Sequence, residues 1–206
     1  PYDDIDKNSM ERKLFKVIVL ASNYGGGPNV IIGQLLESGV TISFDEAREQ
    51  LKAYRELFTT MNTNMEKLVK ISRSRGYVQF ALGKKRYLRH MLSQLKKIED
   101  KQSKEYRKLK QRIERIIKNT PVQGTAAVMT KAAVRYIYEE IVKNNWDAKI
   151  VLVVHDEIVL EVKDDPVLIE TVGKALKDCM ERAFDEFCHG FPNKVDIKVV
   201  DKWEKE

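Results

Sequence analysis

Val153-Val154-His155-Asp156-Glu157-Ile158-Val159-Leu160-Glu161-Val162 is the stretch that decides the fold. Two apolar, largely β-branched runs flank the tripeptide His155-Asp156-Glu157, which predicts two strands joined by a tight turn. Adjacent carboxylates at the tip of such a hairpin are costly unless a cation balances them. Mg²⁺ takes one or two carboxylates plus substrate phosphates, so the tip is a candidate metal site. An ordinary charged turn explains the same tripeptide equally well.

Outside this hairpin the patterns are mainly helical. Ser9 is a predicted N-cap, Ser43-x-x-Glu46 a capping box, Gly76 a helix stop and Pro166 a first helical residue. The predicted helices span about residues 9–22, 29–37, 43–60, 64–75, 89–118, 124–144 and 165–187. A short hairpin is predicted over 77–88 and a last strand over 195–200. The fold class expected is α+β, with a helical part at 1–75 and an antiparallel sheet backed by helices at 76–206.

Composition excludes several classes of protein. The chain has 206 residues, 43% of them hydrophobic, which is enough to bury a core. No apolar run approaches the ~20 residues that a membrane helix needs, and the start at Pro1 shows no signal segment. Cys179 and Cys188 lack CxxC spacing, which argues against a zinc site or a disulfide framework. Reduced thiols and no membrane are therefore expected, with the cytoplasm, or a host's cytoplasm for a viral protein, as the location.

Positive charge is concentrated in one stretch. Residues 84–118 hold fourteen Lys/Arg against four acids, a net +10, whereas the whole chain carries +6 and the remainder therefore −4. A basic stretch of this kind indicates a polyanion partner, because phosphates supply much of the affinity for nucleic acids. A solvated helix face is the alternative.

The first predicted helix carries Arg12 and Lys16 four residues apart, hence on one face suited to a triphosphate. Tyr24 follows two turns later. Arg-x₃-Lys is common on surface helices, so the pair gains its weight from its order and distance relative to the other motifs.

Four blocks of the sequence resemble family A (DNA polymerase I-like) DNA polymerases, in the family's order. Val154-His155-Asp156-Glu157 resembles motif C, and Arg12-x₃-Lys16-x₇-Tyr24-Gly25 resembles motif B. Arg115-x₃-Asn119-x₃-Gln123-Gly-Thr-Ala-Ala is similar to a further segment of the family. Gly76-Tyr-Val and Gly83-Lys84-Lys85-Arg86-Tyr-Leu resemble its G-Y-V…G-R-R-x-Y-L hairpin. The resemblance covers most of the chain and implies a fingers-like part at 1–75 and the second half of a palm at 76–206.

The resemblance also implies roles at the catalytic end. By this resemblance, Asp156 would be the metal-binding catalytic aspartate and Glu157 would be a weaker ligand or supporting acid. His155 would lie near the primer terminus. Arg12, Lys16 and Tyr24 become the dNTP-binding residues. Two Mg²⁺ ions, dNTPs and primer-template DNA are the implied cofactors and partners.

Other residues would contact nucleic acid by the same resemblance. Arg115, Asn119 and Gln123 would touch template-primer, and the arginine and glutamine would read minor-groove acceptors that all base pairs share. If helical geometry persisted, their spacing would put them along one face, but Pro121 is predicted to interrupt the helix. Lys84, Lys85 and Arg86 would meet a nucleic-acid backbone.

Two departures from the family pattern stand out. Leu20 occupies the position of the usual Phe or Tyr after the lysine. The family's motif A aspartate has no counterpart: Asp3, Asp4 and Asp6 lie too close to Arg12 and are expected to form an acidic lead-in to the first helix. The chain alone is therefore expected to be nearly inactive, and to work with the N-terminal remainder of the polymerase on the same or a separate chain.

Two other functions are compatible with these residues. A noncatalytic nucleic-acid-binding module derived from a polymerase would keep the basic stretch without the chemistry. A metal-dependent hydrolase using His155 and Asp156 is a further alternative, although His90 and His189 lie in segments without ligand spacing.

Overall fold

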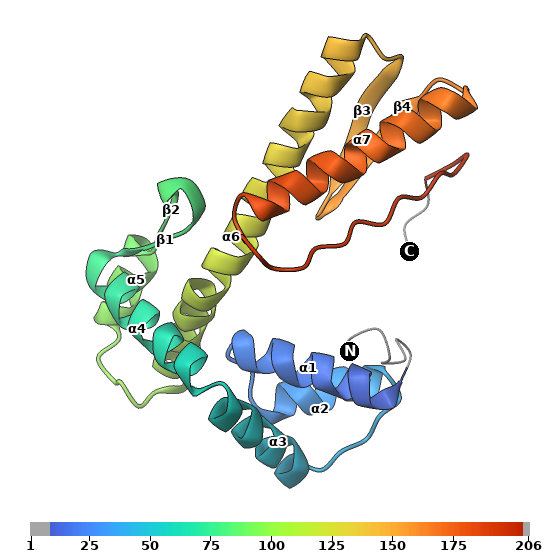
Figure 1. Ribbon diagram of the computed structural model, residues 1–206. Coiled ribbons are helices and arrows are strands. Elements are labelled where there is room, and N and C mark those ends of the chain that lie inside the picture. The colour runs from blue at the N-terminus through green and yellow to red at the C-terminus, as the bar shows by residue number, and fades with distance from the viewer. Residues whose placement is uncertain (1–8, 204–206) are drawn as a thin grey trace. The chain divides into compact units, whose positions relative to one another are not determined.

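The computed structural model describes residues 9–203, so Asp3, Asp4 and Asp6 lie outside the described residues. The predicted α+β class is confirmed: the structure is mainly helical and also contains two small antiparallel sheets (Figure 1). The chain divides into two compact units, one ending at Val122 and the other beginning at Gln123. The predicted division into parts at 1–75 and 76–206 is a functional one and stays a prediction.

Three helices open the first unit: α1 (Met10–Asn23), α2 (Pro28–Glu37) and α3 (Phe44–Leu57). The predicted caps are confirmed, since Ser9 Oγ accepts from the Arg12 N–H at 3.2 Å and the Ser43/Glu46 capping box is complete. The third helix ends at Leu57, three residues before the predicted end at 60. The three helices share one buried cluster, which consists of Ile18, Ala21, Ile31, Leu35, Ala47, Leu51 and Tyr54.

The rest of the first unit is built around a short hairpin. Its elements are α4 (Thr59–Arg75), β1 (Tyr77–Gln79), the 3-10 turn Ala81–Gly83, β2 (Lys85–Tyr87) and α5 (Arg89–Lys97). Gly76 ends α4 in the left-handed conformation with φ +78°, as predicted. Val78 and Leu88 are fully or almost fully buried and anchor the hairpin on a cluster with Leu95, Ile113 and Ile117.

The helix α6 (Lys104–Asn144) corrects two predictions. The predicted single helix over 89–118 is broken at residues 98–103, where Asp100 Oδ1 accepts from the Gln102 N–H and Ser103 Oγ from the Tyr106 N–H. The predicted interruption at Pro121 is wrong, because helical structure continues through it. Pro121 removes a single main-chain donor from a helix of 41 residues, and Ile117 and Thr120 in the preceding turn are buried.

The second unit contains β3 (Ala148–Val154), β4 (Glu157–Val162) and α7 (Pro166–Asp185), with the C-terminal part of α6. The two strands pair antiparallel, and the register of pairing shifts between Ile150 and Leu152. Asp165 caps α7 by accepting from the N–H groups of Val167 and Leu168. Figure 1 shows α7 running alongside the hairpin, and their shared core includes Ile137, Ile141, Ile158, Val172 and Leu176.

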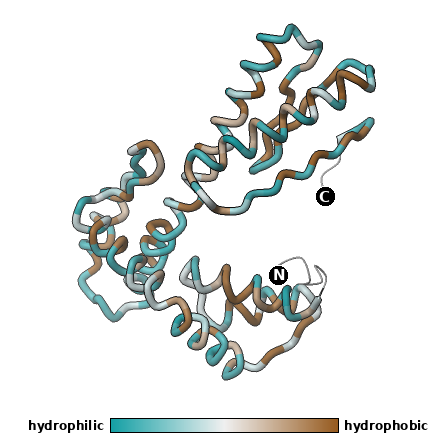
Figure 2. The backbone as a smooth tube through the Cα atoms, viewed as in Figure 1, coloured by the Kyte–Doolittle hydropathy of each residue, from teal (hydrophilic) through white to brown (hydrophobic). Residues whose placement is uncertain are grey.

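The predicted last strand at 195–200 is wrong. The segment makes no strand pairing within residues 9–203, and Val199 and Val200 are exposed. Figure 2 shows hydrophobic and hydrophilic residues interspersed along it, which is the pattern that suggested a strand. β propensity requires a neighbouring ladder to pair with, and the described residues offer this segment none. In the part of the chain that the structure describes, no helix is both long and apolar enough to span a bilayer.

Candidate functional site

The tip of the β3–β4 hairpin carries the predicted catalytic tripeptide. Val154 pairs with Glu157, so His155 and Asp156 form the whole connection between the strands. His155 has φ +55°, a left-handed conformation that is uncommon outside glycine and is found disproportionately at functional sites. His155, Asp156 and Glu157 are all exposed. The hairpin therefore presents its polar atoms to solvent from a short, strand-anchored turn.

Glu157 has a partner that the sequence did not indicate. The indole N–H of Trp203 donates to Glu157 Oε1 at 2.9 Å across 46 residues of sequence. This hydrogen bond fixes one carboxylate of the tip, while the neighbouring Asp156 carboxylate stays exposed. No short motif links the two residues, so only the fold brings them together.

Hard carboxylate oxygens on an exposed tip fit Mg²⁺, which keeps several waters and accepts substrate phosphates as ligands. Among residues 9–203, no group of three or more His, Cys, Asp or Glu side chains is placed to hold a metal ion. Asp156 and Glu157 can thus supply one side of such a site, with the remaining ligands coming from phosphates, water or other carboxylates.

The predicted dNTP-binding cations lie on one solvent-facing stripe of α1. Arg12 and Lys16 are exposed, and Leu20 continues the stripe with 37% exposure. Ile18 and Ala21 are buried against the neighbouring helices, which fixes the rotation of α1. Leu20 therefore lies at an accessible position on the same face as the two cations.

A tight turn at the end of α1 brings two predicted motifs together. Tyr24 is the C-cap of α1, and Gly25 follows with φ +72°. A Cβ atom at Gly25 would lie 3.6 Å from Cγ of Arg115, so this turn lies directly beside α6. The Gly26 N–H donates to the Ala21 carbonyl at 2.6 Å, and a Cβ there would lie 3.1 Å from the same oxygen. Glycine thus suits position 25 through its positive φ and position 26 because a side chain there would crowd Ala21.

All three predicted template-primer residues of the later segment lie on α6. Arg115 and Gln123 are exposed, whereas Asn119 is partly buried. Asn119 Oδ1 is buried and has no hydrogen-bond partner among the described residues. A buried amide oxygen without a partner costs about 1–3 kcal/mol, and its burial keeps this atom out of reach of an external ligand in this conformation. Arg115 and Asn119 belong to the first unit, and Gln123 is the first residue of the second.

The predicted backbone-binding cations Lys84, Lys85 and Arg86 are exposed at and beside the turn of the β1–β2 hairpin. Lys85 Nζ lies 4.8 Å from the centre of the Tyr77 ring, a cation–π contact that leaves the ammonium at the surface. The exposed cations form a positive edge on the hairpin.

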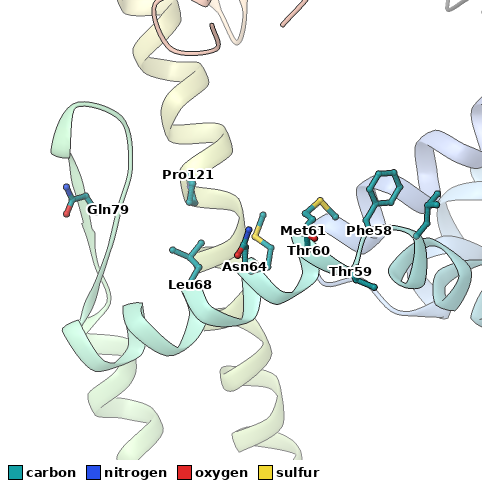
Figure 3. Close-up of a pocket in the computed structure, with 10 residues that line it drawn as sticks. Phe58, Thr59, Thr60, Met61, Asn64, Leu68, Gln79 and Pro121 are labelled. Atoms are coloured by element: carbon teal, nitrogen blue, oxygen red, sulfur yellow. The ribbon is translucent and has the colours of Figure 1, made fainter. Parts of the chain in front are cut away.

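A cavity of about 800 Å³ lies elsewhere in the first unit (Figure 3). It is lined by Leu57, Phe58, Thr59, Thr60, Met61, Asn64, Met65, Leu68, Gln79 and Pro121. None of these side chains titrates near neutral pH, and none belongs to the predicted site. The cavity therefore offers apolar and amide contacts but no acid–base or metal-binding chemistry.

Comparison with known proteins identifies the family of the chain. The family model of DNA polymerase family A matches residues 2–205, and the chain belongs to this family. It is 28% identical over 168 residues to DNA polymerase I of Caldicellulosiruptor bescii, covering 81% of this chain and 17% of that protein. The chain is 27% identical to the thermostable DNA polymerase I of Thermus aquaticus, and this match covers 82% of this chain and 18% of that protein.

A solved structure agrees with the sequence relatives. The POL domain of Pol1 from M. smegmatis, in complex with DNA primer-template and dNTP, matches with a TM-score of 0.67 and 26% identity. The match covers 89% of this chain and 29% of that one. The chain thus spans less than a fifth of the length of the two polymerases named above.

Proposed function

We propose that this chain is the C-terminal part of a template-directed DNA polymerase, that it carries motifs B and C, and that the completed polymerase adds dNTPs to a primer 3′ end by two-metal phosphoryl transfer. The single observation that carries the proposal is the exposed Asp156 carboxylate on a two-residue turn, in a chain whose family is DNA polymerase family A. When bound, Mg²⁺ would activate the attacking oxygen and stabilise the leaving pyrophosphate.

The three residues of the hairpin tip would have different roles at the reacting centre. Asp156 would hold metal, together with a motif A carboxylate supplied by the N-terminal remainder of the polymerase, on the same or a separate chain. Glu157, held through its Oε1 by Trp203, would serve as a supporting acid and weaker ligand. His155 would lie near the primer terminus.

The cations of α1 would bind the incoming nucleotide. Arg12 and Lys16 lie one turn apart on an exposed face, which suits two phosphates of a triphosphate. Tyr24, at the end of the same helix and beside the Gly25 turn, would close over the templating pair. Leu20 would pack on the sugar with less contact area than an aromatic ring offers.

The α6 residues and the first hairpin would hold the nucleic acid. Arg115, Asn119 and Gln123 would contact primer-template, Arg115 and Gln123 through exposed side chains. Lys84, Lys85 and Arg86 would pair with backbone phosphates. In this proposal residues 1–75 act as fingers and 76–206 as the second half of the palm, in the cytoplasm or, for a viral protein, in that of the host.

Primer extension tests the proposal. The chain alone, with Mg²⁺, dNTPs and primer-template, is expected to show almost no extension, because two-metal chemistry needs carboxylates on both sides of the ions. Addition of a motif A-bearing polymerase part, on the same or a separate chain, is expected to produce extension. Robust extension by the chain alone would overturn the proposed division of the site.

The basic region of α5 and α6 favours one other function, a noncatalytic nucleic-acid-binding module. That function predicts DNA binding by the chain and no extension with any motif A-bearing part. Extension in the complemented enzyme, abolished by substitution of Asp156, would exclude it.

A further inference from the structure

A basic hollow of about 590 Å³ lies at the base of the β1–β2 hairpin, where α4 ends and α5 begins. Four cationic side chains and two hydroxyls line it: Arg73, Arg75, Arg89 and Lys96, with Ser74 and Ser93. No carboxylate is among the residues that line the hollow, which is therefore strongly positive.

The charges of this basic hollow are poorly compensated. Arg73 pairs with Glu114 at 3.8 Å, whereas Arg75 and Lys96 make no ion pair within residues 9–203. Arg73 and Arg75 stand in the last turn of α4, where cations suit the helix dipole. Arg89, by contrast, is the first residue of α5, the end at which a cation is disfavoured. The helix dipole therefore does not explain an arginine at this position, whereas an anion bound in the hollow would explain it.

Backbone geometry keeps Arg89 in this position. Gly76 has φ +78°, and a Cβ on it would lie 3.1 Å from Arg89 Cγ. The Leu88 N–H donates to the Gly76 carbonyl at 2.8 Å, which ties the start of α5 to the end of α4. The absence of a side chain at Gly76 therefore lets Arg89 lie across this junction.

One face of the hairpin adds aromatic rings to the same surface. Tyr77 and Tyr87 are a cross-strand pair with ring centres 6.1 Å apart, and Tyr87 is 65% exposed. Because Val78 is buried in the core, its neighbour Tyr77 faces the opposite side. Lys85 lies against the Tyr77 ring, and Arg89 Cζ lies 5.8 Å from the Tyr87 ring centre. A cation thus lies against each of the two paired rings, and Arg89 belongs to both the face and the hollow.

We propose that the aromatic face and the basic hollow together bind single-stranded DNA, with a base stacked on Tyr87 and strand phosphates held by Arg75, Arg89 and Lys96. Rings on which bases stack, beside cations that track the backbone, are the combination that binds unpaired strands without sequence preference. The assignment of this strand to the unpaired template rests on the proposed function, whereas the binding surface itself does not. It uses none of Arg12, Lys16 or Asp156.

The test measures binding without any polymerase activity. The full chain is titrated into a fluorescently labelled oligo(dT) of about 20 nucleotides, with no dNTP or metal, and anisotropy is recorded at several salt concentrations. Tyr87→Ala is expected to weaken binding at least about fivefold, because the base can no longer stack on the ring. Tyr138→Ala, which removes a tyrosine of similar exposure (59%) on α6, is the control and is expected to have no effect.

The hollow is tested by a pair of charge-matched double variants. Arg75→Ala/Lys96→Ala is expected to reduce the slope of log K against log salt by about 0.7 for each phosphate that the protein no longer neutralises. Lys52→Ala/Lys174→Ala makes the same change in net charge on other exposed helix positions and should leave the slope close to that of the unchanged protein. Equal slopes for the two double variants would overturn the role of the hollow.

A free polyphosphate could supply the same anionic groups, so tripolyphosphate is titrated as a competitor. The proposal expects weak competition and a continued dependence of oligo(dT) binding on Tyr87. Tight tripolyphosphate binding with identical oligo(dT) affinities for Tyr87→Ala and Tyr138→Ala would instead assign the hollow to a small anion and overturn the proposal. Failure of primer extension in the complemented enzyme leaves these binding results unchanged, so the two proposals fail separately.

Discussion

The two hairpins of this chain share an architecture and differ in charge. β1–β2 and β3–β4 are both two-stranded and antiparallel, and each turn region contains a non-glycine residue in the left-handed conformation, Leu82 at φ +56° and His155 at φ +55°. The first hairpin ends in exposed cations and the second in exposed carboxylates. A cationic hairpin can meet phosphates directly, whereas an acidic one repels them unless a metal ion lies between.

The hairpins also differ in how their charged groups are held. Lys85 rests on the Tyr77 ring within its own hairpin. Glu157 is held by Trp203, which is 46 residues away in sequence. The first contact is local to one hairpin, whereas the second depends on the fold of its unit. We infer that position matters more at the acidic tip, as metal-assisted chemistry requires.

The largest expected effect concerns the anchor of the acidic hairpin. Ile158 is 7% exposed and belongs to the core of the second unit, so Ile158→Ala should destabilise that unit by roughly 2–5 kcal/mol. Hydrogen exchange of the β3–β4 amides measures the change in stability. Val153→Ala, at a 44% exposed position on β3, is the control and should cost well under half as much. Similar destabilisation by the two variants would show that the hairpin is not anchored through one face.

A smaller effect is expected at the cationic hairpin. Lys84→Ala/Lys85→Ala should weaken primer-template binding about tenfold near physiological salt and reduce the salt slope by about 0.7–0.9 for each phosphate that the variant no longer neutralises. Anisotropy titrations across a salt series measure both quantities. An unchanged slope would show that these lysines do not contact nucleic-acid phosphates.

The smallest effect has the opposite sign. In EDTA, Asp156→Asn/Glu157→Gln should strengthen primer-template binding about twofold, because two negative charges no longer repel the phosphates. In Mg²⁺ this advantage over the unchanged protein should disappear, because the carboxylates of the unchanged protein then hold the metal. Weaker binding by the double variant in EDTA would contradict the comparison, since it would mean that the carboxylates accept hydrogen bonds from the DNA directly.

Local signals in the sequence were sufficient for the caps and the hairpins. Ser9, the Ser43/Glu46 box, Gly76 and Pro166 act within a few residues of themselves, and each has the predicted structure. The same holds for the strands that flank His155-Asp156-Glu157. The α+β class and the family followed from these elements and the motifs.

Features that depend on distant partners could not be predicted in this way. Residues 195–200 have a strand-like pattern, but pairing requires a neighbour that the pattern does not specify. Continuation of α6 through Pro121 has no local signal either, since a proline ordinarily ends or kinks a helix. The Trp203–Glu157 hydrogen bond and the approach of Gly25 to Arg115 arise from tertiary structure alone.

The central claim is that the acidic tip acts through metal rather than by touching DNA. The most direct measurement compares Asp156→Asn with Asp164→Asn, an exposed aspartate beyond β4, in the polymerase completed by a motif A-bearing part. We predict that Asp156→Asn lowers the rate of Mg²⁺-dependent primer extension on the order of a thousandfold or more while primer-template affinity stays within about threefold, and that Asp164→Asn changes neither. Near-normal extension by Asp156→Asn would contradict the claim.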